Sequence, residues 1–294
     1  IHSSWGGTAV EAWTDRKLQT SDEFKPITES WETTSQEGSN QTLNQNRPGN
    51  LYDGMISPLL PYGIRGAIWY QGERNSRDER AKLYGMQLTT MIRNWRDVFQ
   101  QGDFPFGIVQ LPNYMQPQQQ PSEPTGWVNI REQMAKTADD PSLGTVGLAV
   151  TIDIGDASNI HPKNKQEVGQ RLARWALVEV YGKDIVAGGP LLKSIRPLDD
   201  GFLVQLKQCG EGLKTTDGES VRGLAIAGDD REFHFAEAKI IDKDTIQVRC
   251  DEVKKPVAVR YGWAPNPDLN LINSEGLPTA PFRSDDWDEP ITQR

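Results

Sequence analysis

The sequence is poor in cysteine and histidine. It holds two cysteines, Cys209 and Cys250, and three histidines. Two cysteines are too few for a scaffold held together by disulfides, although these two could pair with each other. The chain contains no Cys-x-x-Cys motif, no cluster of metal-ligating residues and no glycine-rich phosphate loop. The sequence therefore offers no reason to expect a metal ion or a nucleotide cofactor.

The sequence also lacks long hydrophobic runs and an excess of positive charge. No apolar run approaches the ~18 residues that a membrane span needs. The formal net charge is -9 and the pI is about 5.0. Nucleic acids and anionic membranes would repel such a chain, so we expect neither as a partner. Its 36% hydrophobic and 25% charged residues fit a globular protein of one large or two ordinary domains.

One short apolar run, Gly66–Tyr70, ends abruptly in Gln71, Gly72 and Glu73. An apolar run of this length predicts a strand that is buried on both faces. Because ligands bind outside the carboxyl ends of such strands, Gln71 and Glu73 are expected at the mouth of a cleft. The amide of Gln71 could donate to an oxyanion, and Glu73 could hold that amide in place. The alternative is a strand end that merely carries polar residues.

Further strands and helices alternate with this run. We expect an N-terminal strand, a turn and a polar loop, and then strands separated by helices. The strands are predicted at 1–4, 66–70, 106–111 and 145–152, the helices at 77–100, 128–138 and 162–181, and the loops at 14–50 and 112–124. Such alternation predicts a mostly parallel α/β sheet with helices on it.

The pattern changes near Lys183. Short alternating apolar runs separated by Gly, Asp and Lys turns follow over residues 190–262, and this is typical of a small antiparallel β unit. We therefore divide the chain into an α/β domain, residues 1–185, and a β-rich C-terminal region, residues 186–294.

His161 lies in a loop between a predicted strand and a predicted helix. A general base is commonly placed in such a loop, but a histidine before a proline can also simply be solvated. The other two histidines are weaker candidates. His2 falls within a predicted strand, and His234 falls in an alternating β run.

Several blocks of the sequence together resemble the sialate O-acetylesterase family of the SGNH hydrolases. The likeness spans nearly the whole chain, and it is carried by these blocks: Ile1–Thr8, Glu11–Trp13, Ile68–Glu73, Asp153–Asp156, Ile160–Pro162 and Lys165. The Gln-Gly-Glu and His-Pro blocks in this order are its specific part. The resemblance implies a flavodoxin-like three-layer α/β core and hydrolysis of acetyl esters on sugars, without a metal or cofactor. It also implies a secreted, periplasmic or lysosome-like location.

The resemblance assigns an oxyanion and substrate-binding group. By this likeness, the backbone N–H groups around Gly6 and Gly7 and the amide of Gln71 are the oxyanion donors. Glu73 and Asn75, which follow Gln71, are expected in the same group. Acetylated carbohydrate is then the expected substrate, and loops 14–50 and 112–127 are expected to shape its site.

The resemblance makes His161 the general base of a serine esterase. SGNH enzymes usually place an aspartate three residues before this histidine, where the present chain has Ser158. We expect Asp156 to orient His161 instead. Asp153 or a backbone carbonyl are the alternatives.

The family's nucleophilic serine lies in a Gly-Gln-Ser-Asn block upstream of the residues that match Ile1–Thr8. Ser3 and Ser4 are no substitute, because they belong to the oxyanion block and lack a nucleophile elbow. We therefore expect the chain to be a fragment, inactive alone, whose serine lies on an upstream segment. That segment is either simply cut off, or it is an N-terminal fragment of the same precursor in a proteolytically split enzyme. Two other functions remain open. One is a sugar-binding protein without a nucleophile, and the other is a glycosidase that uses Glu73 and Asp156.

Overall fold

A computed structural model describes residues 1–35, 44–77 and 79–292. Its centre is a three-stranded parallel sheet in the order β1-β2-β3, formed by Ala67–Trp69, Phe106–Val109 and Val146–Ala149. The connections carry helices α2 (Tyr84–Phe99) and α3 (Gly126–Ala138), and α4 (Lys165–Glu179) follows β3. The predicted parallel α/β arrangement is confirmed, and all three strands end at the same edge of the sheet.

Helices cover both faces of this sheet. Phe106 and Ile108 of β2 point into a core that also contains the buried stripe of α2. Gly107, between them, faces the other way, against Trp175 of α4. A Cβ atom at Gly107 would lie 2.9 Å from the Trp175 ring, so only glycine allows α4 to pack this closely. Alternate residues of one strand thus pack against helices on opposite faces of the sheet.

The edge strand β1 differs from its prediction. Trp69 is buried, but Ile68 is 70% exposed, so this strand is not covered on both faces. Among the described strands β1 pairs with β2 alone. The strand predicted at residues 1–4 is also wrong, because this segment is irregular and exposed. A strand needs a neighbour for its backbone hydrogen bonds, and residues 1–4 have none here.

The predicted loop 14–50 is only partly a loop, since it contains helix α1 (Lys25–Ser35). The predicted turn at residues 5–8 is present and runs into a short 3-10 helix. The remaining helical turns are single 3-10 segments, with one π turn at Tyr52–Ile56. The 3-10 segments are Val10–Trp13, Arg16–Leu18, Asp22–Phe24, Ser57–Leu59, Glu73–Ser76, Glu79–Leu83 and Pro141–Leu143.

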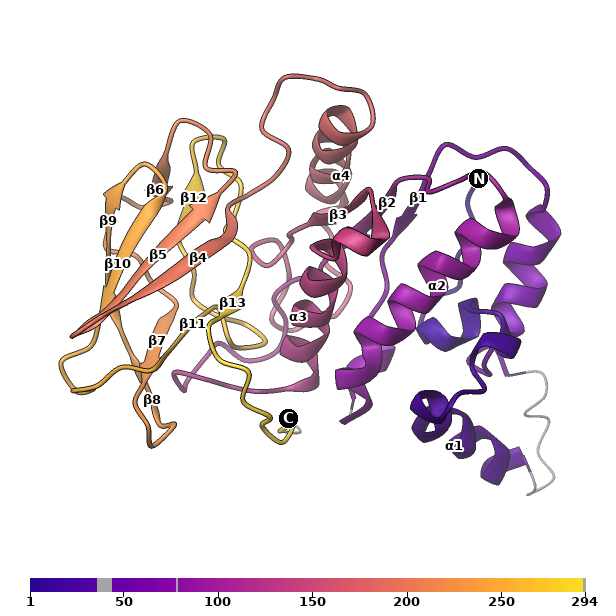
Figure 1. The fold of residues 1–294 in the computed structure, drawn as a ribbon, viewed down its shortest axis with the longest axis horizontal. Helices are drawn as coiled ribbons and strands as arrows, with labels where there is room; N and C mark the ends of the chain where they lie inside the picture. The colour runs from indigo at the N-terminus through magenta and orange to yellow at the C-terminus, as the bar shows by residue number, and fades with distance from the viewer. Residues whose placement is uncertain (36–43, 78, 293–294) are drawn as a thin grey trace.

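An antiparallel β unit follows α4 and lies at the opposite end of the molecule from α1 (Figure 1). It contains two four-stranded sheets and a two-stranded ribbon, and it has its own hydrophobic core. One sheet is β4-β5-β10-β9 (Leu191–Leu198, Gly201–Lys207, Thr245–Arg249, Glu237–Asp242). The other is β13-β11-β7-β8 (Phe282–Arg283, Ala258–Tyr261, Leu224–Ala227, Phe233–Phe235), and the ribbon is β12-β6 (Leu271–Asn273, Leu213–Thr215). The division at residues 185 and 186 stays a prediction.

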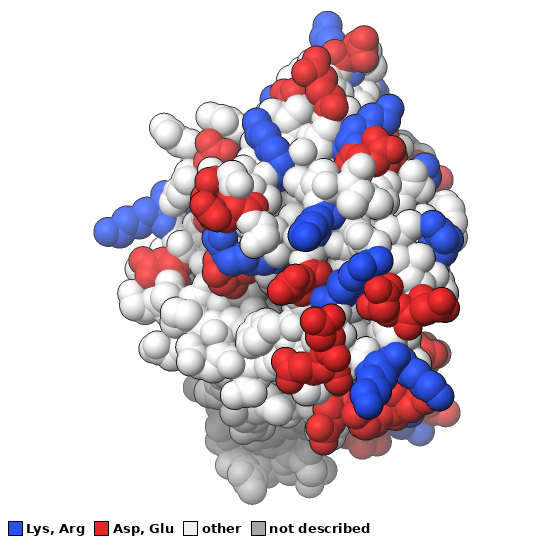
Figure 2. All heavy atoms as spheres, turned by 90° about the vertical axis from the view of Figure 1, so that its left-hand side faces the viewer, with Lys and Arg blue, Asp and Glu red and all other residues white. Residues whose placement is uncertain are grey.

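The surface of this end of the molecule carries charges of both signs. In Figure 2, Asp and Glu side chains gather in the lower part of the face, and Lys and Arg side chains are scattered among and above them. The face in this view therefore offers no continuous basic surface of the kind that binds a phosphate backbone. Cys209 and Cys250 both lie in this unit and are free thiols, so the two do not pair in this structure.

Arg131 of α3 links the two halves of the chain. Its side chain is buried, and its guanidinium donates to four backbone carbonyls. The acceptors Leu111 and Pro112 follow β2, at 2.8 and 2.5 Å, and Ala264 and Pro265 follow β11, at 2.9 and 2.8 Å. Burial lowers the pKa of the guanidinium. One side chain thus fixes the loop after β2 against the C-terminal β unit.

Candidate active site

Gln71 lies at the carboxyl end of β1, as predicted, but its amide is already occupied. Its Nε2 donates to the backbone oxygen of Thr8 and to Oδ1 of Asn75, both at 2.8 Å. Its Oε1 accepts from the Tyr84 hydroxyl at 3.0 Å. An amide nitrogen has two hydrogens, and both have partners here. In this structure Gln71 ties the N-terminal turn to the end of β1.

Asn75 continues this connection. Its Oδ1 also accepts from the backbone N–H of Val10 at 3.1 Å, and its Nδ2 donates to Oε2 of Glu11 at 2.9 Å. Gln87 of α2 donates to the same carboxylate oxygen at 3.2 Å. A buried network therefore positions the segment that begins at the Gly6–Gly7 turn. Gly6 and Gly7 themselves are exposed, and Gly7 has a φ of 71°, which glycine adopts without strain.

Glu11 was not among the predicted site residues, although it is the acidic centre of this network. It is 7% exposed, and burial raises the pKa of its carboxyl group, while hydrogen bonds from Asn75 and Gln87 oppose the rise. The short segment Glu11–Trp13 did belong to the recognisable blocks of the sequence. A charged residue directly beside apolar neighbours was the available signal.

We expect the Glu11→Gln variant to change the pH dependence of stability. The pKa of this carboxyl group is higher in the folded state than its unfolded value of 4.5. As the pH rises from 4.5 through the folded pKa, the unfolded state loses its proton first, so the folded state becomes less stable relative to it. As the pH rises through this window, the wild type should therefore lose unfolding free energy that the variant keeps. Urea unfolding of both proteins between about pH 4 and pH 8 measures the difference. A difference that does not vary with pH would contradict the assignment.

A second cluster joins the end of β1 to the start of α4. The Lys165 Nζ lies 4.5 Å from the centroid of the Tyr70 ring and 3.4 Å from its hydroxyl. Burial raises the pKa of Glu73, and the charges of Lys165 and His161 oppose this rise. Burial also lowers the pKa of Lys165, and Glu73 opposes that shift. Glu73, Lys165 and His161 therefore lie close enough to interact electrostatically. Neither Tyr70 nor Lys165 was predicted as a site residue.

His161 is exposed in the loop between β3 and α4. Its backbone N–H donates to Oδ1 of Asn159 at 2.9 Å, and the buried Pro162 follows it. Over the part of the chain that the structure describes, no side chain or backbone group hydrogen-bonds to its imidazole. The ring is thus available at the carboxyl edge of the sheet.

The two candidate aspartates contact other residues. The Asp156 carboxylate accepts from the backbone N–H and the hydroxyl of Ser158, both at 2.8 Å. These bonds lower its pKa. Asp153 forms a bidentate pair with Arg171 of α4, at 2.5 and 2.8 Å. The structure gives neither aspartate a hydrogen bond to His161, so an orienting role for Asp156 stays a prediction.

One Ser–His hydrogen bond does occur, at the N-terminal end. Oγ of Ser4 lies 2.7 Å from Nε2 of His2, and both residues are exposed. Oγ of Ser3 donates to the backbone oxygen of Met55 at 3.1 Å. No carboxylate among the described residues contacts His2, so this pair lacks the third group that orients the base of a catalytic triad.

A family model described as carbohydrate esterase, sialic acid-specific acetylesterase, matches residues 1–178. The chain belongs to this family. Mouse sialate O-acetylesterase is 33% identical to it over 244 residues, which cover 70% of this chain and 44% of the mouse protein. Human sialate O-acetylesterase is 28% identical over 307 residues, covering 96% of this chain and 56% of the human protein.

A solved structure supports the same relationship. The crystal structure of a carbohydrate acetylesterase from Xanthomonas citri matches this chain with a TM-score of 0.83 and 39% identity, over 97% of this chain and 60% of that chain. The chain spans about half the length of the curated relatives that it matches.

Neither a membrane-spanning helix nor a metal-binding cluster occurs in the described residues. None of their helices is both long and apolar enough to cross a bilayer. Within residues 1–35, 44–77 and 79–292, no group of three or more His, Cys, Asp or Glu side chains is placed to hold a metal ion.

Proposed function

We propose that this chain forms part of a carbohydrate O-acetylesterase that acts through a serine–histidine acyl-enzyme. The observation that carries the proposal is the position of His161. Its imidazole is exposed at the carboxyl edge of the parallel sheet, within electrostatic reach of Glu73, which follows β1. Membership of the esterase family supports the choice of reaction. An acetylated sugar is the proposed substrate class.

In the proposed reaction, His161 takes the proton of a serine hydroxyl while the serine oxygen attacks the acetyl carbonyl. The tetrahedral intermediate collapses, the bond to the sugar oxygen breaks, and His161 returns the proton to the leaving alcohol. A water molecule then attacks the acetyl-enzyme while His161 takes its proton. The serine ester bond breaks, His161 returns the proton to the serine oxygen, and acetate leaves. Asp156 is retained as the proposed orienting residue, and it would have to exchange its bonds to Ser158 for one to His161.

The oxyanion formed in each step needs N–H donors. We assign this role to the exposed backbone N–H groups of Gly6 and Gly7 and to Asn75, which uses one amide hydrogen on Glu11. Gln71 acts in this scheme by holding Thr8 and Asn75 together, since both its N–H groups have partners. Glu73 and Lys165 line the entrance beside the base.

In this proposal the serine lies outside residues 1–294, on a segment of the same precursor that adds a strand beside β1. The exposed edge of β1 supports this. Ile68 is 70% exposed there, and Ile1 and Trp5 of the N-terminal segment are 74% and 53% exposed. An unpaired strand edge with apolar residues favours the addition of a further strand. A sheet completed in this way would be the flavodoxin-like SGNH core. Export or a lysosome-like location follows only from the family.

Labelling of the protein, purified from its natural reading frame, tests the proposal. We expect acetate release from O-acetylated sialic acid or acetylated xylo-oligosaccharides, and covalent labelling by a fluorophosphonate. Mass spectrometry should map the label to a serine outside residues 1–294, and the Ser4→Ala variant should still be labelled. A label on Ser4 would overturn the external nucleophile. Absence of both label and acetate would overturn the esterase.

The same experiment separates a glycosidase from an esterase. Burial raises the pKa of Glu73, whereas the bonds from Ser158 lower that of Asp156. A two-carboxylate glycosidase needs one protonated acid and one ionised carboxylate, and these opposite shifts would suit Glu73 and Asp156 to the two roles. A two-carboxylate glycosidase would release shortened sugars from unacetylated oligosaccharides and would ignore the fluorophosphonate. The family match favours the esterase.

A further inference from the structure

A cavity of about 580 Å³ opens in the C-terminal β unit, away from His161. It forms where the chain passes from one sheet to the other. Strand β8 ends at Phe235 in the second sheet, and β9 begins at Glu237 in the first, with Ala236 as the corner between them. Leu224 and Ala238 line the hollow next to this corner. Its size is that of sites that hold small organic ligands.

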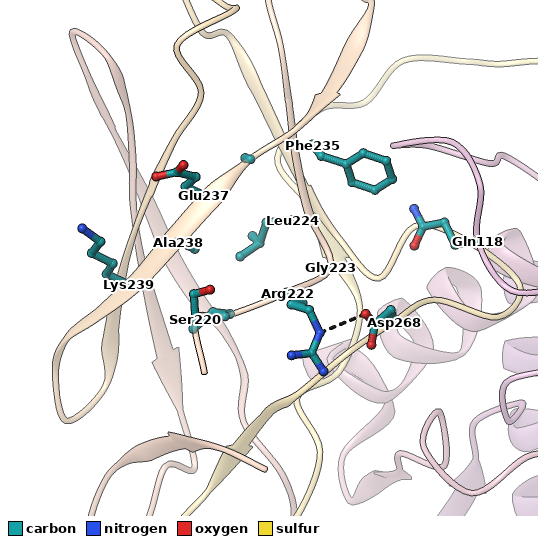
Figure 3. A pocket seen from close by; sticks show the side chains of 12 residues that line it. Gln118, Ser220, Arg222, Gly223, Leu224, Phe235, Glu237, Ala238, Lys239 and Asp268 are labelled. Carbon is teal, nitrogen blue, oxygen red and sulfur yellow. Dashed lines mark hydrogen bonds and ion pairs between the residues drawn. The ribbon is translucent and has the colours of Figure 1, made fainter. Parts of the chain in front are cut away.

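Phe235 provides an apolar surface at this cavity. Its ring is 54% exposed, although large aromatic side chains are usually well buried. In Figure 3 the ring projects away from the strand and toward Gln118, so the cavity separates the two side chains. An exposed aromatic face beside polar groups is suited to a ligand with one apolar face and a polar rim.

Arg222 provides a fixed hydrogen-bond donor. Its Nε donates to Asp268 at 2.9 Å, the bond drawn in Figure 3, and its Nη1 donates to Asp217 at 2.6 Å, so two carboxylates hold the guanidinium in place. Its Nη2 has no partner among the residues that the structure describes. A guanidinium held by two partners retains donors for a third without losing its orientation.

The charges around the cavity favour an uncharged ligand. Arg222 and Lys239 are its cations, and Glu237 and Asp268 line it as well. Asp217 adds a third carboxylate against Arg222. The lining charges balance, and Arg222 is already paired with two carboxylates, so an anionic ligand such as a phosphate or an acidic sugar gains no net attraction. Hydroxyl groups, which both donate and accept, suit this mixture of donors and acceptors.

The loop that carries Gln118 also reaches the candidate active site. Gln118 donates its backbone N–H to Asn266 at 2.9 Å, next to Asp268 of the cavity. Earlier in the same loop, Asn113 accepts from the backbone N–H of Gly155 at 2.6 Å, in the segment that leads to His161. The loop thus connects the cavity to the catalytic edge through a continuous stretch of ordered chain.

We propose that this cavity binds a neutral sugar residue, with one ring face against Phe235 and its hydroxyl groups on Arg222, Gln118 and Glu237. The site is separate from the catalytic edge, so it would hold an unacetylated part of a glycan. The proposal needs no ester cleavage and can succeed or fail independently of the proposed esterase activity.

Binding of unacetylated xylohexaose and cellohexaose to the purified protein tests this site, with saturation-transfer difference NMR and titration calorimetry as readouts. We expect at least one of the two to bind, and Phe235→Ala to weaken that binding about tenfold. Ile241→Ala is the matched control. Ile241 is a similarly exposed apolar side chain, 52%, on β9 but outside the cavity, and its loss should leave binding unchanged. The wild type, Phe235→Ala and Ile241→Ala should have similar melting temperatures.

Three results would overturn the proposal. The first is that the wild type binds neither hexasaccharide. The second is that Phe235→Ala binds as tightly as the wild type. The third is that Ile241→Ala weakens binding as much as Phe235→Ala does. If the wild type binds 3′-sialyllactose more tightly than lactose, and Phe235→Ala loses this difference, the preference for a neutral ligand would be overturned. Hydrolysis of 4-nitrophenyl acetate by the protein expressed from its natural reading frame, which includes the proposed serine, serves as the separate readout of the catalytic edge, and Phe235→Ala should not change it.

Discussion

The His161→Ala variant is expected to lose nearly all acetylesterase activity while it keeps its fold. In the proposed mechanism the imidazole takes the serine proton and returns it to the sugar, and removal of a general base costs about 10²–10⁴ in rate. The side chain is exposed and its ring has no hydrogen bond to the described residues, so the free energy of unfolding should change by about 0.5 kcal/mol or less. Acetate release and urea unfolding measure the two quantities.

His234→Ala is the control for this prediction. His234 lies on β8 in the C-terminal β unit, where its ring meets Glu252 at 3.2 Å, far along the chain from the candidate site. Its replacement should leave kcat close to that of the wild type. Wild-type turnover in His161→Ala would refute the base assignment, and an equal loss in both variants would show that the effect is not specific to the catalytic edge.

The Arg131→Ala variant is expected to lose about 3–5 kcal/mol of unfolding free energy. The guanidinium is 1% exposed and donates to four backbone carbonyls from two distant segments. Alanine would remove a donor from each of these carbonyls in a space that the side chain had filled, and only Pro112 and Pro265 would keep another donor among the described residues, Trp127 Nε1 and the Tyr114 N–H. Urea unfolding of the purified variants measures the loss.

Two further variants keep this prediction testable. Lys136→Ala removes an exposed charge from the same helix, where Lys136 only pairs with Glu132 at 2.9 Å, and should cost about 0–1 kcal/mol. Arg131→Lys retains the charge but fewer donors, so its stability should lie between those of the wild type and the alanine variant. Two outcomes would contradict the role assigned to the carbonyl contacts. One is that Arg131→Lys is as stable as the wild type, and the other is that Lys136→Ala loses as much stability as Arg131→Ala.

The sequence predicted those parts of the fold that depend on local patterns. The stripe of Leu88, Met91 and Trp95 predicted α2, and these residues are indeed buried. The apolar runs predicted β2 and β3, and the change of pattern after α4 predicted antiparallel strands. Helical and strand periodicity are properties of neighbouring residues, so a single sequence reveals them. The family resemblance was equally local, because it rested on short blocks, and the family match confirms it.

The predictions that failed concern pairing, which depends on what lies beside a segment. Residues 1–4 resemble a strand, but no described strand is next to them, and Ile68 of β1 is exposed because one face of this edge strand is uncovered. The segment predicted as a loop contains α1, because its few apolar residues, such as Ile27, are buried against the rest of the protein. Such outcomes depend on tertiary contacts that no local pattern records.

The sequence by itself thus determined the alternation of strands and helices, the family, and the exposed loop that presents His161. Only the tertiary structure decided how the polar residues of the site are used: Gln71 and Asn75 fasten the N-terminal turn, Asp156 binds Ser158, and Phe235 borders a cavity in the β unit. The physical reason is that a donor or a carboxylate acts on whichever partner folding brings within about 3 Å, and these partners lie far away in the sequence or on another strand.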